Sequence, residues 1–285
     1  MIYLMLISTV IAASLNSICM KKAKLSTNAI FSFNLLVSAV WLVIAFVVRG
    51  GGLTLNGSVI FWGAVYGITQ FLFILFKTAS MNAGPVSVTT LIGNASLLIS
   101  VCVSVIAWRE AVTAIDIVGL TLLLLAIFLC TYKKSNEAYK PKWKYLTIAF
   151  CIFAAAVGLV FKAFGKTSNI TYRDDMLVIA SAVMLLLYSV FCLFKRSLQT
   201  KNAPKPGVWF FVSALLCGIL SYFYNRSNML LADTLDAIIF FPAFNGGVVL
   251  LSAVLSVGFC KEKLSAKQSI GILIGVLAIC IIGMF

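Results

Sequence analysis

Long apolar runs separated by short polar stretches make up nearly the whole chain. Cutting the sequence at charged residues, glycines and prolines gives ten apolar segments, at residues 1–20, 29–48, 58–79, 86–107, 113–131, 145–164, 176–194, 208–231, 237–258 and 269–285. Each has about the 17–25 residues with which a helix crosses roughly 30 Å of hydrocarbon. Backbone groups in lipid must hydrogen-bond internally, and the alternating pattern of barrel strands is absent. The pattern predicts an all-α integral membrane protein with ten transmembrane helices.

The longest polar stretch lies in the middle of the chain, at residues 132–144. Most other connections are short, so helices that follow one another are expected to be antiparallel neighbours. The stretch 132–144 is therefore interpreted as a linker on the cytoplasmic side. It divides the chain into two five-helix units, residues 1–131 and 145–285.

The two units share an ordered set of residues. Shifting the first unit by 152 residues places Glu110 on Glu262 and Gly119 on Gly271. Because each unit has an odd number of helices, the second must enter the membrane from the opposite face. The sequence thus predicts a 5+5 inverted repeat, an architecture found in many secondary transporters.

Composition narrows the functional classes. The chain is 62% hydrophobic and only 11% charged, and it has no histidine, whereas a soluble domain carries roughly 25% charged residues. The net charge of +14 resides mainly in short loops, which is typical of cytoplasmic loops rather than of a nucleic-acid surface. No activated nucleophile, acid–base pair or P-loop is recognisable. We therefore expect no enzyme, no nucleic-acid partner, and no cofactor or metal; the eight cysteines are interpreted as small, free side chains.

The distribution of basic residues predicts the orientation. If the loops are assigned to alternate sides, sixteen of the 22 Lys and Arg residues fall on one side and six on the other. Lys77 is counted among the sixteen. Since Lys and Arg concentrate in cytoplasmic loops, both chain termini are predicted to lie outside. The first segment has no basic residues before it and is expected to be retained as the first span rather than removed as a signal peptide.

Two related motifs connect the fourth segment to the fifth and the ninth to the tenth. They read Trp-Arg-Glu-Ala-Val-Thr-Ala-Ile-Asp-Ile-Val-Gly (108–119) and Cys-Lys-Glu-Lys-Leu-Ser-Ala-Lys-Gln-Ser-Ile-Gly (260–271). They resemble the EamA-type branch of the drug/metabolite transporter superfamily, whose pattern is a loop Gly-Glu, a Ser/Thr or Leu-Thr cap, and a glycine that opens the next helix. Here Arg109 and Lys261 replace the glycine before each glutamate.

The resemblance implies ten helices, a central cavity and alternating access. It places the cavity between the first, third, fourth, sixth, eighth and ninth helices. It does not imply a substrate, because the superfamily handles amino acids, sugars, nucleotide sugars, choline-like cations and drugs. Glu110 and Glu262 are interpreted mainly as helix-capping residues, since acids are favoured near helix N-termini.

All eight acidic residues lie in loops or at segment ends, which argues against the antiport of lipophilic cations by a buried carboxylate. Two basic residues, Lys162 and Arg226, intrude into apolar segments. Either they extend to the lipid headgroups, or they attract an anionic or zwitterionic substrate. With no buried acid, the charge of Arg226 is expected to meet water, a carbonyl or substrate.

Uncharged polar residues near mid-membrane complete the candidate substrate site. An alternative role for them is hydrogen bonding that joins helices. Pro242 and the run Asn245-Gly246-Gly247 should weaken the ninth helix at that depth, which would expose backbone groups. The candidate substrate-binding residues are Tyr66, Gln70, Asn94, Lys162, Tyr222, Asn225, Arg226 and Asn245.

The sequence therefore predicts a secondary transporter that moves a small polar metabolite (neutral, zwitterionic or anionic) through a central cavity. Its partners are a small-molecule substrate and the lipid bilayer, its location is the plasma or inner membrane of the cell, and it acts as a monomer or a homodimer. The alternatives are a flippase for lipid-linked sugars or lipids, and a membrane scaffold that transports nothing.

Overall fold

Helices account for nearly all of the chain that the structure describes. The computed structural model describes residues 1–23, 29–53, 56–131, 140–167, 170–197, 207–260 and 265–283, and these contain no strand. The elements are α1 (Ile2–Lys22), α2 (Ala29–Arg49), α3 (Gly57–Met81), α4 (Val86–Asn94), α5 (Ser96–Trp108), α6 (Ala114–Thr131), α7 (Trp143–Gly165), η1 (Ile170–Tyr172), α8 (Arg173–Ser197), α9 (Val208–Thr234), α10 (Ala237–Phe241), η2 (Pro242–Gly246), α11 (Gly247–Cys260) and α12 (Ala266–Gly283).

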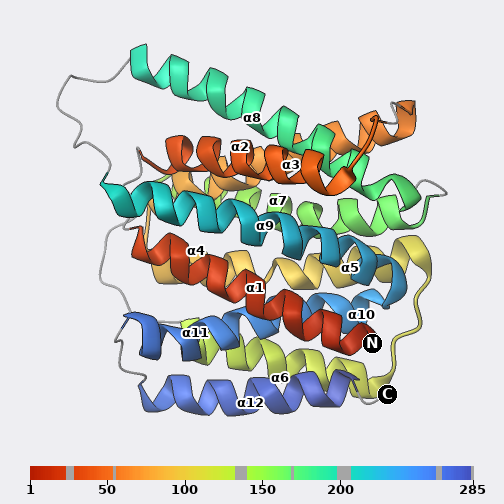
Figure 1. The fold of residues 1–285 in the computed structure, drawn as a ribbon. Coiled ribbons are helices and arrows are strands. Elements are labelled where there is room, and N and C mark those ends of the chain that lie inside the picture. The colour runs from red at the N-terminus through yellow and green to blue at the C-terminus, as the bar shows by residue number, and fades with distance from the viewer. Residues whose placement is uncertain are drawn as a thin grey trace.

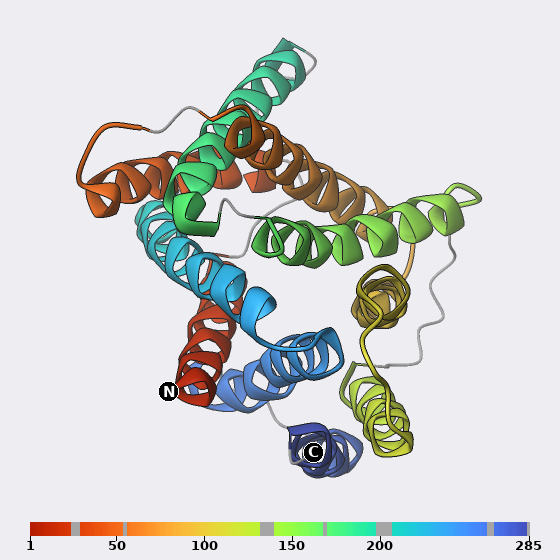
Figure 2. The same ribbon diagram turned by 90° about the vertical axis from the view of Figure 1, so that its right-hand side faces the viewer.

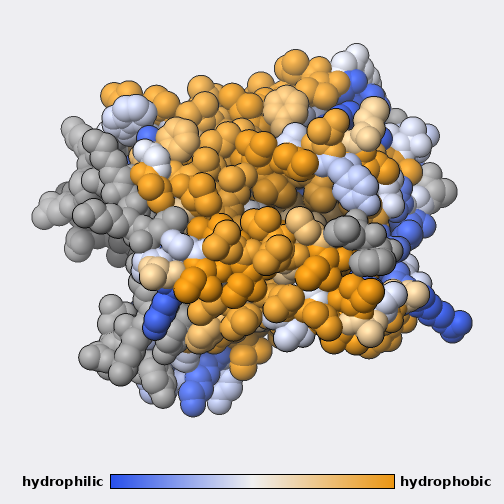
Figure 3. Space-filling model, turned by 90° about the horizontal axis from the view of Figure 1, so that it is seen from below, coloured by the Kyte–Doolittle hydropathy of each residue, from blue (hydrophilic) through white to orange (hydrophobic). Residues whose placement is uncertain are grey.

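The described residues include nine helical stretches that are long and apolar enough to cross a membrane. Two of them join consecutive elements: Val88–Trp108 combines α4 with α5, and Ala237–Phe259 combines α10, η2 and α11. A shorter apolar helix, Ala266–Ile282, overlaps most of the tenth predicted segment, 269–285. Figure 3 shows a broad apolar surface across the middle of one face, with hydrophilic residues toward its two ends. The prediction of an all-helical membrane protein is confirmed, while a tenth full-length span stays a prediction.

The helices lie roughly alongside one another, so the bundle has two ends (Figure 1). Both chain termini lie at the same end, which faces the viewer in Figure 2. At this end α2 finishes with Arg49 and α8 begins with Arg173, and we call it the ion-pair end. At the opposite end α1 finishes with Lys22 and α7 begins at Trp143, and we call it the basic end.

The helices α6 and α12 form a pair at one edge of the bundle (Figures 1 and 2). A Cβ atom on Gly119 of α6 would lie 2.5 Å from the Ile282 side chain of α12. Reciprocally, a Cβ atom on Gly271 of α12 would lie 3.0 Å from the carbonyl oxygen of Ala126 of α6. The two motif glycines are therefore the points at which these helices approach each other closely, as small residues permit in membranes.

Two capping boxes begin α6 and α12 in the same way. Thr113 N–H donates to Asp116 Oδ2 (2.9 Å), and Asp116 N–H donates back to Thr113 Oγ1 (3.2 Å). At positions 152 residues later, Ser265 N–H donates to Gln268 Oε1 (2.9 Å), and Gln268 N–H donates to Ser265 Oγ (3.3 Å). Each box satisfies two backbone donors that the first turn of a helix leaves without an intrahelical partner.

Two spans are irregular near their midpoints. The backbone of Ala95 separates α4 from α5, and η2 is a single π-helical stretch, Pro242–Gly246, between α10 and α11. Proline lacks an N–H and crowds the preceding turn, and π-helical turns of this kind occur frequently at functional sites. The predicted weakening of the ninth span is confirmed as this π-helical stretch.

Contacts between helices follow a reciprocal scheme. The helix α1 contacts α9 and α11, while α7 contacts α3 and both α4 and α5. Likewise α2 contacts α9, and α8 contacts α3. In chain order, α1, α2, α3 and α4–α5 of the first half correspond to α7, α8, α9 and α10–α11 of the second. The contacts of α1 with α9 and α11 then correspond to those of α7 with α3, α4 and α5, and the contact of α2 with α9 corresponds to that of α8 with α3.

Candidate substrate cavity

The bundle encloses a cavity with a volume of about 340 Å³, within the range of small-molecule sites. On α1 the lining residues lie in the second half of the helix, from Ala13 to Met20, and on α3 they lie within the last three turns or so, from Gln70 to Lys77. The cavity therefore extends from the middle of the bundle toward the basic end. Its wall includes the helices that the family resemblance implied, together with α2 and α8, which contribute Trp41 and Tyr188.

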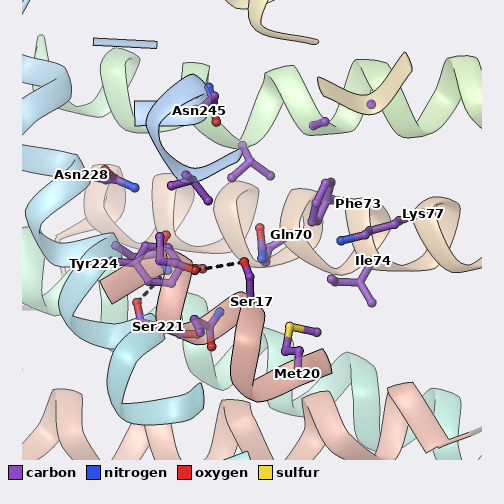
Figure 4. Close-up of a pocket in the computed structure, with 18 of the residues that line it drawn as sticks. Ser17, Met20, Gln70, Phe73, Ile74, Lys77, Ser221, Tyr224, Asn228 and Asn245 are labelled. Atoms are coloured by element: carbon purple, nitrogen blue, oxygen red, sulfur yellow. Dashed lines mark hydrogen bonds between the residues drawn. The ribbon is translucent and has the colours of Figure 1, made fainter. Parts of the chain in front are cut away.

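Amide side chains from six spans reach this cavity, and α9 contributes two of them; they are Asn16, Asn34, Gln70, Asn94, Asn225, Asn228 and Asn245. Figure 4 shows Gln70, Asn228, Asn245 and Ser17 around the same space. Three buried amide oxygens on the wall, those of Asn16, Gln70 and Asn228, have no hydrogen-bond partner among the described residues. A buried polar atom without a partner costs free energy. These oxygens are therefore free to accept hydrogen bonds from water or from a bound molecule.

Aromatic rings supply much of the remaining wall. Phe73 stands beside Phe150, with ring centroids 5.6 Å apart, and Phe240 is stacked on Phe244 at 6.0 Å. Glycines allow helices and rings to come close here: a Cβ atom on Gly93 would lie 2.2 Å from the Phe150 ring. The cavity thus combines an apolar lining with a few polar groups, which is the usual composition of a small-molecule site.

Four of the eight predicted site residues lie on the cavity wall, namely Gln70, Asn94, Asn225 and Asn245. Tyr66 and Tyr222 are fully buried outside it. The Tyr66 hydroxyl donates to Asn225 Oδ1 (2.9 Å), and its ring is stacked on Phe161. Tyr66 therefore supports a wall residue, and Tyr222 contributes to an ion pair at the ion-pair end.

Lys162 neither extends to the headgroups nor faces the cavity. Its side chain is completely buried and forms an ion pair with Glu110. Its Nζ also donates to the carbonyl oxygen of Leu235 (3.3 Å) and lies 5.9 Å from the centroid of the Trp108 ring. Glu110 Oε2 accepts a hydrogen bond from Ala237 N–H (2.7 Å), so this glutamate caps α10 instead of its own helix. Both interpretations of Lys162 from the sequence are therefore corrected. Glu262 lies outside the described residues.

The expectation for Arg226 is also corrected. Its guanidinium binds the carboxylate of Asp174 through two hydrogen bonds, Nε to Oδ1 at 2.6 Å and Nη2 to Oδ2 at 3.0 Å. Tyr222 donates to the same carboxylate (3.4 Å). Next along α8, Asp175 pairs with Arg49 of α2. The acid that Arg226 was expected to lack lies at the start of α8, and Arg226 is not on the cavity wall.

Lys77 is the wall residue whose role the sequence pattern obscured. It lies inside α3, one turn before the end of that helix at Met81, and not in a loop as the count of basic residues assumed. Its Nζ is 5.6 Å from the centroid of the Phe73 ring. The spacing of Gln70, Ile74 and Lys77 at i, i+4 and i+7 was the available signal, because it places all three on one helix face.

Comparisons with known proteins agree with this architecture. The family model described as the EamA-like transporter family matches residues 1–132, which confirms the resemblance drawn from the loop motifs. A solved structure described only as the crystal structure of a protein superposes with a TM-score of 0.76, covering 99% of this chain and 98% of the other at 12% identity. At that identity it shows the fold alone. No curated protein sequence matches the chain.

Proposed function

We propose that this chain, a membrane protein whose residues 1–132 belong to the EamA-like transporter family, is a secondary transporter that moves a small polar metabolite by alternating access. The observation that carries this proposal is the cavity, a space of about 340 Å³ lined by amides and aromatic rings inside a bundle of apolar helices. A polar space at this depth suits a molecule that is being moved through the membrane.

Likenesses between the two halves of the chain support the alternating-access part of the proposal. The capping boxes at Thr113 and Ser265 and the close-contact glycines Gly119 and Gly271 are each 152 residues apart, and the helix contacts of one half reappear, exchanged, in the other. Two halves that pack alike can exchange roles, so that the cavity opens first to one side and then to the other.

The two ends of the bundle differ in a way that suits such a cycle. At the ion-pair end, Arg226 and Asp174 join α9 to α8, Arg49 and Asp175 join α2 to α8, and Glu110 and Lys162 join the α5–α6 connection to α7. The cavity lies on the other side of these pairs, toward the basic end. We interpret this arrangement as the conformation in which the ion-pair end is closed.

Filling the cavity should weaken ligand binding while leaving the lipid-facing surface intact. We expect Ser17→Phe, which inserts a ring beside Gln70 (Figure 4), to weaken the binding of any ligand in the cavity by on the order of tenfold or more. Ligands are found by a thermal-shift screen of metabolites against the purified protein, and their uptake is measured in proteoliposomes. Ser8→Phe on the exposed surface of the same helix is the matched control. Equal binding and uptake in both variants would refute the proposed function.

The orientation in the cell membrane can be tested independently. We expect both termini outside and the stretches 132–144 and 195–207 inside, because basic residues concentrate in the loops on that side. A cysteine introduced at residue 138 of a cysteine-free chain should resist an impermeant thiol reagent in intact cells and react after permeabilisation. Labelling at residue 138 in intact cells contradicts this orientation, and a cysteine placed before Ile2 provides the opposite control.

A further inference from the structure

One charged side chain stands on the cavity wall in the described part of the chain, that of Lys77. No carboxylate among the described residues forms an ion pair with it, and its closest charge-related contact is the face of the Phe73 ring. Three other cations of the spans, Arg49, Lys162 and Arg226, each have a carboxylate partner. Lys77 is thus an intramembrane ammonium group whose charge the described protein does not balance.

The position of Lys77 within the cavity allows its charge to bind an anionic ligand. In Figure 4 its side chain points into the cavity, on the side where Gln70 and Ile74 lie. An ammonium group in a low-dielectric cavity is costly unless an opposite charge or good hydrogen-bond acceptors are nearby. A bound anion would supply that opposite charge.

Groups around Lys77 are arranged to hold the rest of an organic anion. Gln70 Oε1 and Asn16 Oδ1 are buried without hydrogen-bond partners, as is Trp41 Nε1, and all three residues line the cavity. The rings of Phe73 and Phe150 form an apolar surface next to them. The wall therefore offers one positive charge, several unused hydrogen-bonding atoms and an aromatic apolar face.

We propose that Lys77 is the anion-binding residue of the cavity, and that the substrate is a small organic monocarboxylate whose body lies against the aromatic wall. This inference rests on the proposed transport function. A single ammonium balances the single negative charge of a carboxylate, whereas a phosphate monoester carries about −1.5 to −2 at pH 7 and would bring excess charge into the cavity. The carboxylate binds Lys77, and Gln70 and Asn16 accept hydrogen bonds from donors on the substrate body.

The test compares acids with their uncharged counterparts. Benzoate, phenylacetate and octanoate are each paired with the corresponding carboxamide, and phenyl phosphate is added as a dianion. Binding to the purified full chain is measured by thermal shift and by tryptophan fluorescence, since Trp41 lines the cavity. We expect the carboxylates to bind more tightly than their carboxamides and more tightly than phenyl phosphate.

Variants of Lys77 then locate the charge that is responsible. Lys77→Met should weaken carboxylate binding on the order of 30-fold, because the carboxylate loses its partner in a desolvated site. Lys77→Arg keeps the charge and should retain most of the affinity. Lys144→Met removes an exposed lysine near the basic end and should change nothing. Where Lys77→Met lowers the melting temperature of the unliganded protein, Lys77→Gln supplies a second neutral variant.

The outcomes separate this inference from the proposed function. Carboxylate binding that is lost in Lys77→Met but kept in Lys77→Arg and Lys144→Met supports the inference. Acids that bind no better than their carboxamides, tighter binding of phenyl phosphate, or unchanged affinity in Lys77→Met overturns it. If the metabolite screen then yields neutral or cationic ligands that Ser17→Phe excludes, the transport cavity stands without an anion site. If Ser17→Phe excludes nothing that binds, the proposed function fails as well.

Discussion

Replacing Glu110 by Gln should lower the free energy of unfolding by about 3–5 kcal/mol, the usual cost of breaking a buried ion pair by removing one partner. The side chain of Lys162 is completely buried and that of Glu110 is 8% exposed. Glutamine keeps an oxygen that can accept the hydrogen bond from Ala237 N–H, so the variant removes the charge while preserving the cap on α10. What remains is an ammonium group with the Leu235 carbonyl as its main acceptor.

Two further variants distinguish the loss of the Glu110 charge from the change of an acid side chain to an amide. Adding Lys162→Met to Glu110→Gln removes the stranded ammonium, and we expect the double variant to regain most of the lost stability. Asp236→Asn makes the same acid-to-amide change at an exposed residue at the start of α10 and should have little effect. Unfolding is followed by melting temperature in detergent. A double variant as unstable as Glu110→Gln alone would show that the buried pair is not the cause.

The spans were predictable because lipid imposes a length on them. The segments 86–107 and 237–258, taken from hydropathy alone, closely match the stretches Val88–Trp108 and Ala237–Phe259. The proline and paired glycines of the ninth segment also carried a local signal, since they alter helix geometry wherever they occur. The prediction did not include the break between α4 and α5 at Ala95, where no proline lies nearby in the sequence.

The ion pairs were not predictable in the same way. Asp174 and Arg226 lie on different helices, 52 positions apart, and Glu110 reaches Lys162 from a connection between helices. Periodicity shows which residues share a face of one helix, but it does not show which helices face each other. The sequence alone therefore leaves Arg226 as a charge without a partner, although its partner is the first acid of α8.

Lys77 was misplaced for a related reason. Hydropathy ends the third segment at residue 79, and a lysine close to that boundary is typical of a cytoplasmic loop. The helix continues to Met81 and its inward face includes Gln70 and Ile74, so the same lysine lies on the cavity wall. A helical-face analysis of the whole third segment, up to residue 79, would have placed Lys77 with Gln70.

The second large effect is expected on transport, when the pair between Arg226 and Asp174 is broken. Their side chains are 31% and 20% exposed, so solvent screens the pair and we expect it to contribute only about 1–2 kcal/mol to the closed ion-pair end. That still shifts a two-state equilibrium by roughly 5–30-fold, enough to change how often this end is closed. Arg226→Gln should therefore slow uptake of a substrate identified in the screen, and should leave binding within the cavity nearly unchanged because Arg226 is not on its wall.

A double-mutant cycle distinguishes a gate from a purely structural contact. We measure initial uptake rates in proteoliposomes, ligand affinity and melting temperature for Arg226→Gln, Asp174→Asn and the two combined. If the pair holds the ion-pair end closed, each single variant leaves one unpaired charge between α8 and α9, and the double variant removes both, so the two changes are not additive in the logarithm of the rate. Additive effects on the uptake rate contradict a gating role for the pair. A loss of ligand affinity in Arg226→Gln alone also contradicts it and would return Arg226 to the substrate site. Its guanidinium would then have to leave Asp174 to bind an anion.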